Sequence, residues 1–441
     1  MGAIPKLAVF VLATALAFIG VLGTGATQAA DAKSEGVLLR WNRMALDLTR
    51  HTATYTPPVA SRAYGYISVA AFEAVASGSD KLRSLAGQLN GLQPVPQRAP
   101  GQAYDEPLVL QAAMAATIQD LFANTGPTGH RAMDALEAKL RHDLSDGVAA
   151  DVVARSEAYG QAIAAHILAW SRDDGGAVVE NMGFPMDYKL TPGPSHWVPT
   201  NVVVQQQVPL LPHWGDNRPF AMPKGSTCPS ATPPAYSEDH ASEYYKQAME
   251  VYQTWKTLTP EQFAMARFWA DDAMLSVTPP GHWLSIAMKI IEHDQPGIEK
   301  SVDTLARLSI VEADAFIGCW NTKFVYDLVR PITYIRRLID PKFETVVNTP
   351  PFPEYPSGHS TQSAAAATIM TSLFGDNYAF VDDTDQEDGL APRPFPSFWA
   401  AANEAAISRL YGGIHYRAAI ELGADQGRCI AAYTVALKTW R

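Results

Sequence analysis

The sequence has few cysteines, a shortage of positive charge and little that resembles a β-strand. Its three cysteines, Cys228, Cys319 and Cys429, show no metal-ligand spacing and allow at most one disulfide, whose partners the sequence does not decide. Lys and Arg together number 34 against 45 Asp and Glu, which gives a net charge of −11. This balance disfavours nucleic acid and anionic membranes as partners.

Long apolar runs are also missing, except at the N-terminus. Lys6 is followed by an apolar run from Leu7 to Leu22 and by small residues up to Ala30. This pattern predicts a signal peptide over residues 1–30 and export, either to the periplasm or out of the cell. A retained membrane anchor is the alternative, because the run is close to the length of a short span. No later stretch approaches eighteen uninterrupted apolar residues, so we expect no stable membrane insertion after signal cleavage.

Helical periodicity recurs on both sides of a stretch rich in Pro, Gly and Trp. We therefore predict an all-α protein with an N-terminal helical bundle over residues 31–173, an irregular connecting excursion over 174–239, and a C-terminal bundle over 240–441. Val202-Val203-Val204 is the one convincing β-like run and suggests a short hairpin inside the excursion. The expected helices cover residues 41–48, 60–75, 107–122, 132–144, 149–170, 242–256, 260–274, 282–293, 302–320, 397–410 and 414–438.

The stretch with the clearest chemistry is Pro356-Ser357-Gly358-His359. It is followed by a helix-forming run from Ser360 to Met370, so it reads as a loop that leads into a helix N-terminus. The free backbone N–H groups and the positive dipole end of a helix bind anions there. We expect His359 to lie in the first helical turn and to face such an anion.

Two further clusters supply positive charge. Lys323 and Arg330 are seven residues apart, which would place both side chains on one face of a helix that Pro331 then disturbs. Downstream, Arg409 ends a helical run, a Gly pair breaks it, and His415 enters the next helix. One Lys, two Arg, two His and a Ser-Gly turn together predict a pocket for a tetrahedral oxyanion.

These three pieces, Lys-x6-Arg-Pro, Pro-Ser-Gly-His and Ser-Arg-x5-His, resemble the signature of the phosphatidic-acid phosphatase type 2 superfamily. That superfamily includes acid phosphatases, lipid phosphatases and vanadium-dependent haloperoxidases. The lack of further apolar spans argues against the integral-membrane lipid phosphatases. Trp320 and Phe352 favour the haloperoxidase branch, because they match positions where its chloroperoxidase-type members place aromatics beside the halide site.

The haloperoxidase resemblance implies two four-helix bundles and a vanadate cofactor. It assigns His415 as the vanadium ligand, and His359 as the acid–base group for hydrogen peroxide. The oxygens of vanadate would be held by Lys323, Arg330, Ser357, Gly358 and Arg409. Lys323 would also polarise bound peroxide, while halide and a small organic acceptor would be the other substrates. The resemblance allows a homo-oligomer, although no stretch indicates an interface.

One further match and one departure concern carboxylates. Phe268-Trp269-Ala270-Asp271-Asp272 is similar to a family segment whose last carboxylate pairs with an active-site arginine, so Asp272, rather than Asp271, is expected to hold Arg409. The family usually places an Asp four residues after the second histidine, but Ala419 stands there. Because a ligating His needs its other ring nitrogen held, Glu421, Glu404 or a backbone carbonyl would have to replace this Asp.

Two other functions use the same pocket. In an acid phosphatase, His415 would attack the phosphorus of a phosphate monoester to form a phosphohistidine, and His359 would protonate the leaving oxygen. A non-catalytic oxyanion-binding protein is the third hypothesis, and Ala419 is its support. The acidic residues between Gly375 and Pro396 favour a solvated surface loop over a calcium site, since the alternation of an ion-binding loop is missing.

Overall fold

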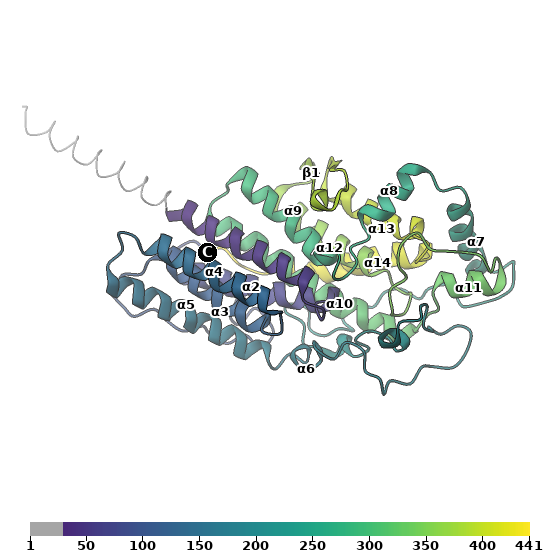
Figure 1. Cartoon of the computed structure of the whole chain (residues 1–441), viewed down its shortest axis with the longest axis horizontal. Helices are drawn as coiled ribbons and strands as arrows, with labels where there is room; N and C mark the ends of the chain where they lie inside the picture. The colour runs from purple at the N-terminus through teal and green to yellow at the C-terminus, as the bar shows by residue number, and fades with distance from the viewer. Residues whose placement is uncertain (1–29) are drawn as a thin grey trace, which may run out of the picture.

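The computed structural model describes residues 30–441, and its regular structure is almost entirely helical (Figure 1). The predicted signal peptide, apart from Ala30, lies outside the described residues. A helix over residues 30–51 comes first. The later helices are α2 (Pro57–Ala76), α3 (Glu106–Leu121), α4 (Pro127–Ser145), α5 (Ala150–Ser171), α6 (Gly176–Val179), α7 (Glu243–Lys256), α8 (Pro260–Phe268), α9 (Thr278–Asp294), α10 (Ile298–Tyr326), α11 (Pro331–Leu338), α12 (Gly358–Phe374), α13 (Phe398–Tyr411) and α14 (Arg417–Val435). None of the helices within these described residues combines the length and the apolar character needed to cross a membrane.

The molecule is elongated, and α10 runs between its two ends. Figure 1 shows α2, α3, α4 and α5 gathered at one end and α7, α8 and α11 at the other. Most residues of α10 are buried, because this helix packs on α2 in the first bundle and on α12 and α14 in the second. The chain end also returns to the first bundle, where the Arg83 N–H donates to the Thr439 carbonyl over 2.7 Å. The all-α prediction with two bundles is confirmed, and a continuous core passes through both.

The excursion between the bundles is irregular but anchored. The carboxylate of Asp314, on α10, accepts three backbone N–H groups at 2.6 to 2.9 Å from residues 220–222. A disulfide between Cys228 and Cys429 ties the excursion to α14, and Cys319 is free and buried. The excursion contains the short helix α6 and two 3₁₀ turns, η1 (Val204–Gln207) and η2 (Trp214–Asp216).

The predicted hairpin at Val202–Val204 is wrong. Val202 is 95% exposed, so these valines have no second layer to pack against, and Val204 begins a 3₁₀ turn. The hairpin within the described residues is instead β1 (Phe380–Asp382) paired antiparallel with β2 (Arg393–Phe395), with the 3₁₀ turn η3 (Gln386–Asp388) between them. It forms in the acidic segment, where Asp382 and Asp385 are buried. The solvated-loop interpretation therefore fails for these two carboxylates.

Two predicted helices end earlier than expected, and both ends position the pocket. They are the helix expected to carry both Lys323 and Arg330 and the helix expected over residues 260–274. Lys323 and Arg330 do not share a helix, because α10 stops at Tyr326 with Asp327 in a left-handed C-cap. Arg330 is extended since it precedes Pro331, whose ring suits the first position of α11. Likewise α8 ends at Phe268 rather than at residue 274.

Candidate functional site

The N-terminus of α12 forms the base of the predicted oxyanion pocket. Ser357 is the N-cap, and its Oγ accepts a hydrogen bond from the Ser360 N–H over 3.3 Å. His359 follows in the first turn. A Cβ added at Gly358 would meet no atom within 4 Å, so the backbone borders open space there. The predicted loop-to-helix geometry is confirmed.

Three cations converge on this helix end from three different elements. Lys323 on α10 and Arg330 at the start of α11 are both 0% exposed, and Arg409 on α13 is 1% exposed. In residues 30–441 none of the three forms an ion pair with a carboxylate; their partners are mostly backbone carbonyls. Three buried cations without counter-ions would be costly unless an anion binds among them.

Burial lowers the pKa of all three cations. Removal from water lowers the pKa of Lys323 to about 7, with the Arg330 guanidinium acting in the same direction. Burial likewise lowers the pKa of Arg330 and of Arg409 to about 10 each. Lys323 Nζ nevertheless donates to the carbonyls of Pro353 and Glu354, at 2.9 and 3.1 Å, and to that of Pro356. These bonds fix the loop before α12 against α10.

His415 is held by a residue that the sequence did not reveal. Its Nδ1 lies 2.9 Å from Oε1 of Glu354, which also accepts the backbone N–H of Tyr416 over 2.9 Å. All three proposed substitutes for the missing Asp are wrong: Glu421 pairs with Arg417, Glu404 pairs with Arg393, and no backbone carbonyl of the described residues takes Nδ1. The available signal was an acidic residue in the otherwise apolar loop just before Pro-Ser-Gly-His.

The Glu354 contact fixes the tautomer of His415. With the proton on Nδ1, the lone pair of Nε2 points toward Arg330 Nη1, which lies 3.2 Å away. Burial, followed by the nearby Arg330 and Lys323, holds the pKa of His415 well below its usual range, so the ring is neutral. Burial raises the pKa of Glu354 to about 7. A neutral imidazole oriented by a carboxylate is the form that ligates a metal.

The predicted pairing of Asp272 with Arg409 does not occur. Asp272 accepts from the Asn348 side chain over 2.8 Å, whereas Arg409 Nη2 donates to the Ala266 carbonyl over 3.2 Å. The early end of α8 explains the difference, because the chain turns at Asp271 (φ 49°) and sends the two carboxylates in different directions. Asp271, the less favoured candidate, lies 3.8 Å from Nε2 of His359.

Both predicted aromatics line the same pocket. The rings of Trp320 and Phe352 lie 4.8 Å apart, and Lys323 Nζ is 5.2 Å from the centre of the Phe352 ring. Arg330 lies over the same ring at 5.0 Å. Trp320 is held in place by its Nε1–H, which donates to the Leu210 carbonyl over 3.2 Å. The structure thus places the aromatics beside two of the three cations, and their role toward a halide stays a prediction.

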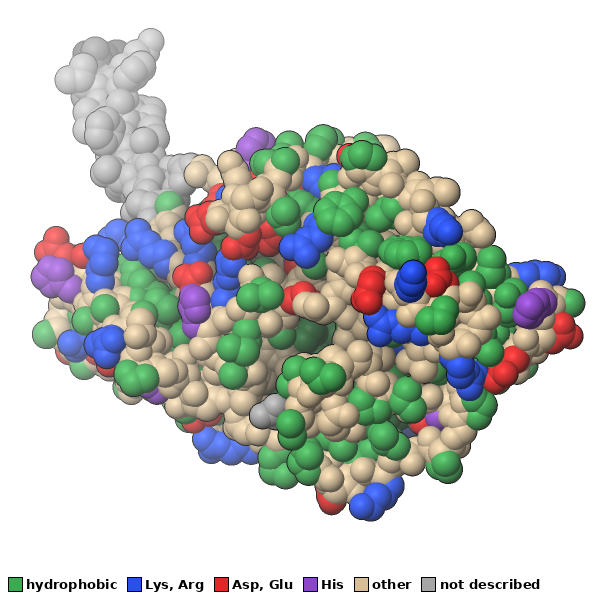
Figure 2. Space-filling view, turned by 45° about the vertical axis from the view of Figure 1, so that its right-hand side comes forward, with side chains coloured by type: hydrophobic (Ala, Val, Ile, Leu, Met, Phe, Trp, Pro, Cys, Tyr) green, Lys and Arg blue, Asp and Glu red, His purple; other side chains and the backbone are tan. Residues whose placement is uncertain are grey.

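The residues present fit a tetrahedral metal oxyanion. Arg330 Nη2 is buried without a hydrogen-bond partner, the Gly358 backbone faces open space, and the pocket carries excess positive charge. The residues that could hold the oxygens are the predicted ones, Lys323, Arg330, Ser357, Gly358 and Arg409, and Nε2 of His415 could ligate the metal. Figure 2 shows that one face of the molecule is hollowed near its centre.

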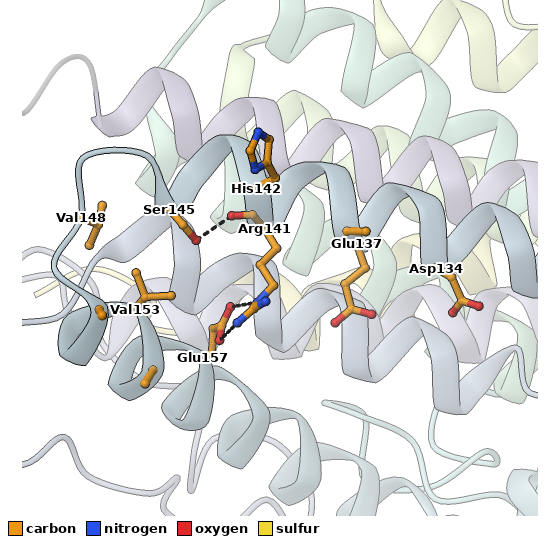
Figure 3. A pocket seen from close by; sticks show the side chains of 11 residues that line it. Asp134, Glu137, Arg141, His142, Ser145, Val148, Val153 and Glu157 are labelled. Atoms are coloured by element: carbon orange, nitrogen blue, oxygen red, sulfur yellow. Dashed lines mark hydrogen bonds and ion pairs between the residues drawn. The ribbon is translucent and has the colours of Figure 1, made fainter.

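A groove without any of these residues lies elsewhere, between α4 and α5 (Figure 3). It has a volume of about 740 Å³, and its one arginine is already paired: Arg141 pairs with Glu157 at 2.5 Å, and Ser145 Oγ donates to the Arg141 carbonyl. None of the predicted site residues lies there.

Comparison of the chain with known proteins gives matches to vanadium-dependent haloperoxidases. Residues 303–440 match the family description "VCPO second helical-bundle domain". The vanadium chloroperoxidase of Curvularia inaequalis is 28% identical over a match that covers 36% of this chain and 36% of that protein's length. A bacterial vanadium-dependent iodoperoxidase has a TM-score of 0.84 and 36% identity, and the match covers 92% of this chain and 97% of that one.

Two more distant structures share the fold. The apo and holo forms of a bacterial vanadium-dependent chloroperoxidase give TM-scores of 0.65 and 0.63 at 15% and 16% identity. Each match covers 87% of this chain, and it covers 93% and 92% of the two chloroperoxidase chains. Identity of 36% over almost the full length, together with the family match on the pocket-bearing segment, is decisive: the chain belongs to the vanadium-dependent haloperoxidase family.

Proposed function

We propose that this protein is an exported haloperoxidase that binds vanadate at His415 and oxidises a halide with hydrogen peroxide. Iodide is the halide we expect first, because the relative that is 36% identical over nearly the whole chain is an iodoperoxidase. The observation that carries the proposal is the set of three buried cations without carboxylate partners, placed around an oriented, neutral histidine. Such a site stabilises a multiply charged oxyanion and presents one nitrogen to its metal.

The side chains would divide the work as follows. Bound vanadate supplies a Lewis acid that activates hydrogen peroxide toward attack by a halide. Burial, followed by Arg409, lowers the pKa of His359 to about 4, so at neutral pH its Nε2 is free to accept a proton from the incoming peroxide. Lys323 and the two arginines hold the negative charge, and the edges of Trp320 and Phe352 offer a place for the halide.

Two features support the export part of the proposal. The N-terminal sequence has the pattern of a signal peptide. The Cys228–Cys429 disulfide links segments 201 residues apart, and such bonds persist mainly in oxidising compartments.

The test uses protein without residues 1–30, loaded with orthovanadate, and measures peroxide-dependent oxidation of iodide, bromide and chloride. Oxidation that requires vanadate, is lost in His415→Ala and survives in His142→Ala supports the proposal. His142 is a matched control because it is exposed in the groove between α4 and α5. A vanadate-free sample is assayed with p-nitrophenyl phosphate. Phosphate release that vanadate inhibits, without halide oxidation, would assign the pocket to a phosphatase instead. Vanadate binding without either activity would leave an oxyanion-binding protein.

A further inference from the structure

A second polar cluster lies behind His359, and the proposed reaction does not use it. His282, on α9, is 0% exposed, and both of its ring nitrogens face carboxylates. Nδ1 lies 3.0 and 3.2 Å from the two oxygens of Asp271, and Nε2 lies 2.8 Å from Oδ2 of Asp382. Because carboxylates only accept hydrogen bonds, both nitrogens must carry protons, and His282 is an imidazolium held between two anions.

This cluster reaches the catalytic histidine through Asp271. Nε2 of His359 lies 3.8 Å from Oδ2 of Asp271 and 3.4 Å from Nη1 of Arg409. An unprotonated Nε2 accepts from Arg409, while a protonated Nε2 has Asp271 as its one nearby anionic acceptor among residues 30–441. Asp271 is therefore the group that stabilises the proton taken up by His359.

We propose that His282, clamped by Asp382, is a positioning residue that orients Asp271 and partly neutralises it, and thereby sets how readily His359 takes a proton. The inference rests on the proposed function for its purpose, since it concerns the acid–base histidine of that reaction. A bare Asp271 carboxylate would keep His359 protonated more strongly. A carboxylate shared with an imidazolium leaves His359 free to accept a proton and to release it again.

The local backbone and packing hold in place the clamp, by which we mean His282 between the carboxylates of Asp271 and Asp382. Asp271, Met274 and Thr278 all have positive φ, at 49°, 67° and 68°, and such strain persists only where the surroundings fix it. Trp269 stacks on the His282 ring at 4.5 Å, and its Nε1–H donates to Glu404 over 3.1 Å. The ring of His282 is thus fixed on its edge and on one face.

Other titratable groups face the clamp from neighbouring elements. Burial raises the pKa of Glu312, on α10, well above its usual range, and it raises that of Asp385, after β1, to about 7. Glu312 therefore adds little negative charge at neutral pH, whereas Asp385 is about half ionised there and loses its charge at lower pH. Burial opposes the charge of His282, but Asp271 and Asp382 raise its pKa well above the usual range. Ligand atoms of Asp271, His282 and Asp385 lie within 4.8 Å of one another, yet both ring nitrogens already have carboxylate partners, which favours a proton over a metal ion.

The test is side-chain NMR of the vanadate-free protein with isotope-labelled histidine rings, in the presence of a chelator. In the wild-type protein, His282 is expected to carry protons on both nitrogens at neutral pH. His282→Gln removes a cation behind Asp271 and should raise the titration midpoint of His359 by about one pH unit. Asp271→Asn removes the anion and should lower that midpoint. General loosening of the pocket would instead raise both midpoints toward the solvent value.

His293→Gln is the matched control, because His293 lies on the same helix and pairs with Asp294 at 2.7 Å on the surface. It should leave the midpoint of His359 unchanged. A neutral His282 in the wild-type protein would overturn the inference whether or not any variant folds, and so would an unchanged midpoint in folded His282→Gln. Because no vanadate is present, these outcomes are separate from halide oxidation. An inactive wild type with the expected titrations would overturn the proposed function alone.

Discussion

The groove between α4 and α5 and the pocket around α12 show opposite ways of arranging charge. In the groove, Arg141 is 61% exposed at the side chain and already pairs with Glu157. In the pocket Lys323, Arg330 and Arg409 are buried, and they meet carbonyls and histidines instead of carboxylates. Exposed, paired charges gain little from a ligand, whereas buried cations that lack anions gain much. Unpaired buried charge distinguishes the candidate site from the groove.

The largest effect is expected when one of the unpaired cations of the pocket is removed. Arg330→Met deletes the buried guanidinium whose Nη2 has no partner, and it should weaken vanadate binding by on the order of a hundredfold or more. The free energy of unfolding of the vanadate-free variant should be unchanged or higher, because a costly buried charge is gone. Titration calorimetry and thermal unfolding measure the two quantities.

Arg141→Met is the counterpart in the groove. It removes an exposed, paired arginine and should leave vanadate affinity unchanged. If Arg330→Met bound vanadate as tightly as the wild-type protein, the cations of the pocket would not be an anion site, and the contrast between the two regions would disappear.

A second variant tests the carboxylate that holds His415 in the pocket. Glu354→Gln keeps the size of the side chain but removes the carboxylate that holds Nδ1 of His415. We expect vanadate binding to weaken by about ten- to a hundredfold, since the partners that orient a metal-ligating histidine have effects of this size. Calorimetric titration of vanadate into each variant measures it.

Glu421→Gln is the control, because Glu421 is exposed and pairs only with Arg417. If Glu354→Gln and Glu421→Gln bound vanadate with equal affinity, Glu354 would have no role in vanadate binding.

Motifs whose residues are close together in the sequence could be predicted, but contacts between residues far apart in the sequence could not. Ser357, Gly358 and His359 follow from a local capping pattern, and they occupy the first turn of α12 as expected. The helices were predictable from periodicity, but the ends of α8 and α10 were not, because their C-caps are Trp269 and the left-handed Asp327, and neither is a glycine that would announce the end.

Long-range pairing explains the remaining misses. Glu354 lies 61 residues from His415, and Asp382 lies 100 residues from His282. The acidic segment around Asp382 has the composition of a solvated loop, but the β1–β2 hairpin turns this carboxylate inward toward α9. Composition reports the average environment of a segment, whereas burial of one side chain depends on which helix packs against it.

The smallest expected effect on binding concerns Ala419, the position where the family resemblance leads us to expect an Asp. Ala419 is 1% exposed and packs with Leu328 and Tyr355, and its carbonyl accepts the Ser357 N–H over 3.0 Å. One and two turns further along α14, Gly423 and Gly427 continue this small-residue face. A Cβ at Gly427 would collide with the Thr361 carbonyl, so α14 lies very close to α12.

Ala419→Asp would therefore bury a carboxylate in an apolar contact, while Glu354 already occupies Nδ1 of His415. We expect vanadate affinity to stay within about threefold, and the free energy of unfolding to fall by about 1–3 kcal/mol. Ala432→Asp, at an exposed position on the same helix, is the control and should change neither quantity. Tighter vanadate binding in Ala419→Asp would mean that Glu354 holds His415 only in part. Unchanged affinity with lower stability would show that Glu354, in the loop before α12, orients His415 without help from a carboxylate on α14.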